Sequence, residues 1–168
     1  MAKKTRTRTL QTSVAAAIPD ALSEIESLRD EMQEWADNME EKLSHTEKYE
    51  RVREAADALE SAVTDVDVPE FADQTISCVE MLPGRKGLAR WKRLSNAVAA
   101  LSAAKDAMEV QRDELREIDD DEVPAEVAAL IGDERTPSEA ADELDSVIEE
   151  VDNIINEAEG VEFPGMFG

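Results

Sequence analysis

Apolar residues recur at helical spacing over residues 18–66, the longest patterned stretch of the chain. In its first half they form columns seven residues apart, which together make a broad stripe. A stripe of this width is typical of a bundle helix and exceeds the narrow seam of a two-stranded coiled coil. We expect the helix to open with Pro19 at its first position. The first column consists of Ile18, Ile25, Met32 and Met39.

The stripe then shifts by one residue and continues through Tyr49, Ala56 and Val63. One explanation is a single straight helix of roughly 70 Å, whose apolar face drifts by about 20° per heptad. The other is a break at residues 44–46, after which the chain turns back as a helical hairpin. Ser44 and Glu47 have the spacing of a capping box, so we favour the break, although no Gly or Pro marks a turn there.

Proline, glycine and capping residues bound the remaining predicted helices. Thr136, Pro137 and Glu139 give the strongest start signal, since they combine an N-cap, a first-position proline and an acidic residue three positions on. No stretch alternates convincingly as a strand. The predicted helices cover residues 69–82, residues 88–118, a short segment from Pro124 to near Gly132, and a last segment from Thr136 to Gly160.

These elements predict an all-α fold, an elongated bundle of coiled-coil-like helices with flexible N- and C-terminal tails. Aromatic residues make up only 4% of the chain and charged residues 35%, which argues against a thick globular interior. We divide the chain into a flexible basic arm (1–17), an acidic helical bundle (18–159) and a hydrophobic C-terminal tail (160–168).

The net charge of −23 predicts a surface that repels nucleic acid and anionic lipid and attracts basic partners. The single cysteine excludes an internal disulfide, so the fold needs no oxidising compartment. No apolar run approaches the ~20 residues of a membrane span, and no signal-peptide pattern follows the basic start. We expect a cytoplasmic protein without membrane contact, with a virion or viral assembly site as the other setting.

Residues that could carry chemistry are few. Glu41 and His45 lie four apart, but no second histidine completes a metal site, so His45 is interpreted as a surface or turn residue. Cys78 lies on the apolar face of the predicted 69–82 helix and is interpreted as a small buried hydrophobe. The acidic run at residues 119–122 lacks the alternation of a calcium loop and is interpreted as a solvated linker. We expect no enzymatic activity, no cofactor and no metal.

The segment from residue 82 to 94 is the most suggestive local feature, because it carries five cations and no acid around a glycine turn. It could hold a phosphate or an acidic peptide. The alternative, which we favour, is that it pairs with acidic helices of its own chain or of a second copy, with Trp91 as a core or interface anchor. Its candidate partner-binding residues are Arg85, Lys86, Arg90, Trp91, Lys92 and Arg93.

Both ends are also candidate partner-binding segments. The basic arm could bind nucleic acid or an acidic protein groove, or serve only as a disordered start. The apolar tail must either fold back onto the bundle or be held by a partner, and we favour folding back because exposure has a hydrophobic cost. The residues concerned are Lys3, Lys4, Arg6 and Arg8 in the arm, and Phe163, Met166 and Phe167 in the tail.

The sequence therefore predicts a non-enzymatic structural, scaffolding or adaptor protein that self-associates and binds protein partners, including basic ones, through helical faces. A first alternative is an acidic mimic of nucleic acid that occupies a DNA-binding protein. A second is a nucleic-acid binder that uses the arm and residues 85–93, the only segments where we expect nucleic acid to bind. The mimic would display spaced carboxylates such as Glu24, Glu31, Asp142, Glu149 and Glu150.

Overall fold

The computed structural model describes residues 8–81 and 87–165, and this part of the chain is mostly helical. The predicted all-α class is confirmed, with a small two-stranded sheet added to it. In chain order the elements are β1 (Thr9–Ser13), α1 (Val14–Leu43), α2 (Glu47–Ala62), the 3-10 helix η1 (Glu70–Ala72), β2 (Thr75–Val79), α3 (Arg90–Arg116), α4 (Ala125–Ile131) and α5 (Pro137–Glu159).

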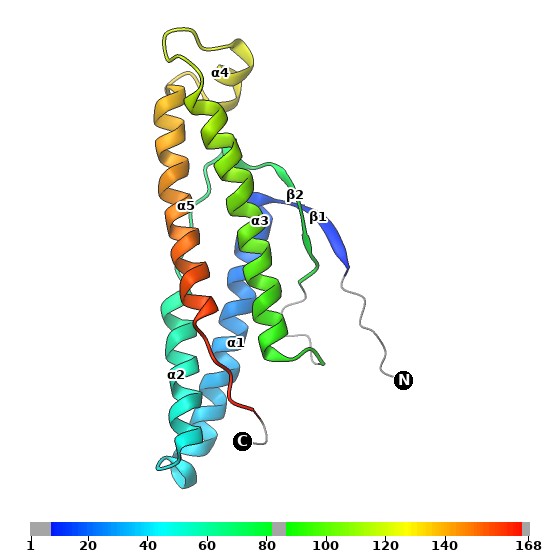
Figure 1. The fold of residues 1–168 in the computed structure, drawn as a ribbon, viewed down its shortest axis with the longest axis vertical. Helices are drawn as coiled ribbons and strands as arrows, with labels where there is room; N and C mark the ends of the chain where they lie inside the picture. The colour runs from blue at the N-terminus through cyan, green and yellow to red at the C-terminus, as the bar shows by residue number, and fades with distance from the viewer. Residues whose placement is uncertain (1–7, 82–86, 166–168) are drawn as a thin grey trace.

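The long helices pack side by side into an elongated bundle (Figure 1). α1 and α2 form a hairpin at one end, α3 and α5 form a second pair towards the other, and α1 packs against α3 between them. α5 and α2 follow one another along the same side of the molecule and meet where each helix ends. No helix in the described part of the chain combines the length and apolar character that a membrane crossing requires.

The first helix begins at Val14, so the prediction that Pro19 opens it is wrong. Ser13 is the N-cap and its hydroxyl accepts from the Ala16 N–H at 3.2 Å. Asp73, far along the chain, accepts from the Ala15 N–H at 3.1 Å. These bonds satisfy amide groups that a helix start otherwise leaves unpaired, which lets α1 begin five residues before the proline.

The break at residues 44–46 is confirmed. α1 ends at Leu43, α2 begins at Glu47, and the two helices form the predicted hairpin. The N-cap is Thr46 rather than Ser44, because the Thr46 hydroxyl accepts from the Tyr49 N–H at 3.3 Å. The shift in the apolar stripe therefore marks two helices that face each other.

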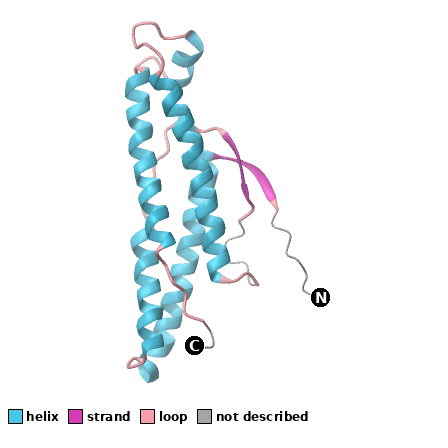
Figure 2. Ribbon diagram, in the orientation of Figure 1, coloured by secondary structure: helices cyan, strands magenta, loops and turns pink. Residues whose placement is uncertain are grey.

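Two predictions for the part of the chain that precedes α3 are wrong. Residues 69–82 do not form a helix, since only η1 is helical there and β2 follows it. Residues 9–13, placed in the flexible arm, pair antiparallel with β2 to make the sheet (Figure 2). Within β2, Ile76 is buried while Thr75 and Ser77 are exposed, which is the two-residue alternation of a strand. The strand is too short for this alternation to stand out in the sequence.

Polar side chains hold β2 and η1 against α3. The amide nitrogen of Gln74 donates to the Ala107 carbonyl at 3.1 Å and to the Gln111 side chain at 3.2 Å. Gln111 in turn donates to the Phe71 carbonyl at 2.8 Å. The strand thus depends on contacts with a helix some thirty residues later, which no local pattern reveals.

The last two helices begin and end close to the proline, glycine and capping residues that predicted them. α4 ends at Ile131, and its C-cap is Gly132, whose φ of +90° is in the region that favours glycine. α5 opens with the predicted capping box, in which Thr136 and Glu139 each bond the other's backbone N–H. Gly160 is its C-cap, as expected.

The centre of α3 is rich in alanine, and these small residues let the neighbouring helices pack closely against it. Ala97, Ala100 and Ala104 are fully buried, whereas Ala99 is exposed. We expect Ala100→Leu to lower the free energy of unfolding by about 1–3 kcal/mol, because the larger side chain has no space between the helices. Ala99→Leu, one residue away, is the matched control and should change it by less than about 0.5 kcal/mol in urea titrations. Equal effects would contradict this packing.

Candidate protein-interaction surface

The first turns of α3 carry a buried ion pair. Arg93 donates from its Nε to the Glu24 carboxylate of α1, and both side chains are almost inaccessible, at 6% and 3% exposure. The same guanidinium donates to Glu31 at 2.5 Å and to the Ser27 hydroxyl at 3.2 Å. One arginine thereby joins three residues along α1 and sets the register of α3 against it.

The charge of Arg93 is stabilised where it lies. Burial lowers the pKa of the guanidinium, but the hydrogen bonds that it donates to Glu31 and Glu24 and the negative charges of these carboxylates outweigh that effect, so its pKa is raised. A permanently charged arginine needs both carboxylates in this setting, because an unpaired buried charge is costly.

Arg90 is engaged in a similar way at the edge of the same contact. Its Nε donates to Glu31 at 3.2 Å, and its guanidinium lies 5.2 Å from the centre of the Trp35 ring. For Arg90 and Arg93 the structure therefore shows pairing with an acidic helix of the same chain. The remaining cations of the segment differ: Lys92 is partly buried, and Arg85 and Lys86 lie outside the described residues.

Trp91 points the other way and is 64% exposed, so it is not a core residue. Residues two apart on a helix are about 200° apart around its axis, which means that burying Arg93 against α1 turns Trp91 outward. α5 ends at Glu159, where its last residues border the same pocket as Trp91 without covering the indole, and the chain continues past them as an extended tail. The first turn of α3 thus lacks a covering helix on the side of Trp91.

A shallow pocket of about 240 Å³ lies between Trp91 and the tail. Val161 and Phe163 of the tail are partly buried and pack against the core, so folding back is confirmed for Phe163, whereas Met166 and Phe167 lie outside the described residues. We call this surface the Trp91 patch. Its lining residues are Trp91, Leu94, Ser95, Val98, Ala158, Glu159, Val161 and Phe163.

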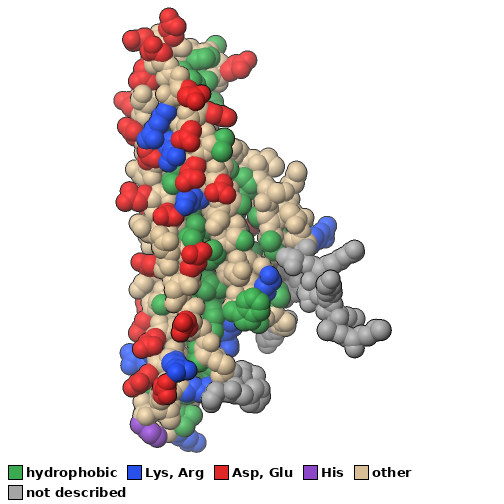
Figure 3. Space-filling model, in the orientation of Figure 1, with side chains coloured by type: hydrophobic (Ala, Val, Ile, Leu, Met, Phe, Trp, Pro, Cys, Tyr) green, Lys and Arg blue, Asp and Glu red, His purple; other side chains and the backbone are tan. Residues whose placement is uncertain are grey.

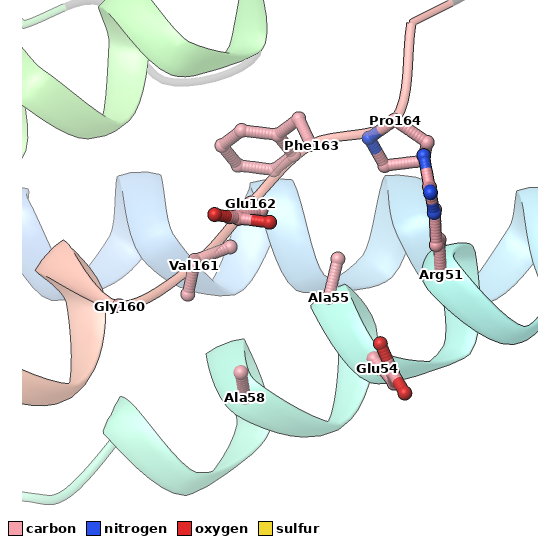
Figure 4. Close-up of a pocket in the computed structure, with 9 residues that line it drawn as sticks. All are labelled: Arg51, Glu54, Ala55, Ala58, Gly160, Val161, Glu162, Phe163 and Pro164. Carbon is pink, nitrogen blue, oxygen red and sulfur yellow. The ribbon is translucent and has the colours of Figure 1, made fainter. Parts of the chain in front are cut away.

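The tail does not fill the groove that it crosses. A second pocket, of about 430 Å³, lies between residues 160–164 and α2, where Ala55 and Ala58 present small side chains (Figure 4). A third, of about 410 Å³, lies farther along, bordered by Met39 and Leu43 of α1. Figure 3 shows hydrophobic side chains running along the seam between α3 and α5 and below it, among acidic and basic ones. This side of the molecule is therefore loosely packed and partly apolar.

The other candidate residues are dispersed. His45 is exposed in the turn between α1 and α2, as interpreted. Cys78 lies in β2 rather than on a helix and is partly buried, and burial together with the Asp20 charge raises the pKa of its thiol. Within the described residues no three His, Cys, Asp or Glu side chains are grouped so that they could hold a metal ion. Arg8 is exposed before β1, and the rest of the basic arm, Lys3, Lys4 and Arg6, lies outside the described residues.

The carboxylates predicted for a nucleic-acid mimic do not form one exposed set. Glu24 is buried and Glu31 is shared by Arg90 and Arg93, so neither is free to imitate a phosphate. Asp142, Glu149 and Glu150 remain exposed on α5. The burial of Glu24 could have been predicted from the sequence, because Glu24 lies on the same helix face as the apolar residues Ala21 and Leu28.

Comparisons of the chain with protein-family models, with curated proteins and with solved structures find no match.

Proposed function

We propose that this chain is a non-enzymatic structural or adaptor protein that binds a protein partner through the Trp91 patch. The observation that carries the proposal is the exposed indole of Trp91 beside a pocket lined by Leu94, Val98 and Phe163. Tryptophan is among the residues that contribute most to binding when an interface buries them. An apolar centre of this kind with a polar rim is typical of protein contacts.

The charge around the patch favours a partner with basic residues at its rim. Glu159 borders the pocket and Glu162 follows it on the exposed side of the tail, within a chain of net charge −23. Acidic groups around an apolar anchor speed encounter with a cationic surface and disfavour anionic partners. The pairing of Arg90 and Arg93 with α1 also leaves fewer cations for phosphate binding, which supports protein contact over nucleic-acid contact.

A photo-reactive amino acid at position 91 tests the proposal in the cells that produce the chain. We expect a discrete adduct with a protein partner, identified by mass spectrometry. The matched control is the same amino acid at Leu130, which is 54% exposed on α4 and distant from the patch. Adducts at neither position, or the same adducts at both, would contradict a specific contact at Trp91.

Trp91→Ala separates binding from folding. Because the indole is mostly exposed, we expect the free energy of unfolding to change by less than about 0.5 kcal/mol. Recovery of the cross-linked partner with the purified chain should fall by about tenfold or more, as for loss of a central interface residue. Leu130→Ala should leave recovery unchanged. Undiminished recovery with Trp91→Ala would place the contact elsewhere.

A further inference from the structure

The small sheet has one edge that nothing in the described chain covers. In the antiparallel register Leu10 faces Cys78 and Thr12 faces Ile76. The ladder continues on either side, since Val14 N–H donates to the Gln74 carbonyl at 3.0 Å and Glu80 N–H donates to the Arg8 carbonyl at 2.8 Å. Even-numbered residues of β1 therefore form the hydrogen-bonded pairs. It follows that the N–H and C=O groups of Thr9 and Gln11 point away from β2.

These outward groups have no partner among residues 8–81 and 87–165, where no hydrogen bond involves them. β2 contacts α3 on its other side, while β1 is the outermost strand in Figure 1. Thr9 and Gln11 are exposed. Proteins usually protect such an edge with a charge, a proline or a bulge, and residues 9–13 contain neither a charge nor a proline.

We propose that β1 pairs with β1 of a second copy, antiparallel about Gln11, so that the two small sheets join into one of four strands. In this register Gln11 lies opposite Gln11 of the other copy and Thr9 lies opposite Ser13. The outward N–H and C=O groups of the two Gln11 residues meet as a hydrogen-bonded pair, and on either side the Ser13 N–H of one copy faces the Thr9 carbonyl of the other. The Ser13 carbonyl takes no part, because that of an N-cap accepts the first bond of its helix. Hydroxyl residues opposite one another are favourable cross-strand neighbours, and no like charges are opposed along the strand.

Charge makes a second copy the fitting occupant. The chain carries a net charge of −23, but residues 1–18 contain four basic and no acidic residues, so this segment of one copy is attracted to the acidic remainder of another. In this register Arg8, the described cation before β1, lies opposite Val14 of the other copy, where the acidic helix α1 of that copy begins. This contact is separate from the Trp91 patch, so either can fail alone.

Light scattering of the full chain, with substitutions at Gln11, tests the edge. We expect the wild-type mass to be twice the 18.5 kDa of one chain. Gln11→Pro removes an N–H that points outward and spares the β1–β2 ladder, so it should weaken the dimer by at least about tenfold. Gln11→Thr keeps the N–H and is the matched control. A monomeric wild type, or a dimer that Gln11→Pro does not weaken, overturns the proposal.

Disulfide trapping tests the register and does not depend on how the proline variant folds. In a Cys78→Ser background, Gln11→Cys should cross-link two copies under mild oxidation, because opposed residues in such a pair have Cα atoms about 5.5 Å apart. Thr9→Cys is equally exposed but faces Ser13, so it should not link to itself. Equal cross-linking at both positions, or none at Gln11→Cys, overturns the pairing. The latter would also be the result if an extended segment of a different protein occupied the edge.

Discussion

Replacing Arg93 with methionine should lower the free energy of unfolding by about 3–5 kcal/mol, the largest effect that we expect from a single substitution. The side chain is 6% exposed and bonds Glu24, which is 3% exposed. Methionine would preserve most of the packing volume but leave the Glu24 carboxylate charged and unpaired in the interior. The measurement is urea unfolding followed by circular dichroism, with the midpoint and the slope fitted separately.

Two further variants show whether the missing partner is responsible. Arg90→Met removes a pair in which both side chains are about one-third exposed, so the loss should stay below about 1 kcal/mol. Combining Glu24→Met with Arg93→Met should recover most of the stability lost in Arg93→Met, because no buried charge is then stranded. A cost below 1 kcal/mol for Arg93→Met, or no recovery in the double variant, would contradict the role assigned to the pair.

Replacing Leu59 with alanine should lower the free energy of unfolding by about 2–5 kcal/mol. Leu59 is fully buried in α2, a helix that packs mainly against its hairpin partner α1. The cost combines the lost transfer of the side chain from water with the cavity that it leaves. The same denaturant titration provides the measurement.

Leu43→Ala is the matched control because it makes the same chemical change at the end of α1, where the side chain is 44% exposed. It should cost less than about 1 kcal/mol, since much less apolar surface is returned to water. If the two substitutions cost the same, α2 would not pack on α1 as the hairpin requires.

The ion pair and the exposed tryptophan are linked by helix geometry. Arg93 turned towards α1 places Trp91 on the opposite side of α3, facing the tail. Loss of Arg93 would therefore loosen the presentation of the patch as well as the fold. The buried charges could serve to specify the register of α3 along α1, in which case an apolar replacement pair would be stable but would present Trp91 less uniformly.

The sequence by itself determined the helical class and most helix boundaries. The shift in the apolar stripe located the break at residues 44–46, and the Thr136, Pro137 and Glu139 signal located the start of α5, because capping and periodicity act within a few residues.

Only the tertiary structure decided the rest. β1 and β2 are short, and each is stable because it pairs with a strand more than sixty residues away, so neither shows a strong local signal. Arg93 and Glu24 became a buried pair because two apolar faces met with one charge on each. Trp91 is exposed rather than part of the core because α5 ends beside it and does not cover it. Periodicity specifies which face of a helix is apolar, whereas the length and position of its neighbours decide how much of that face is covered.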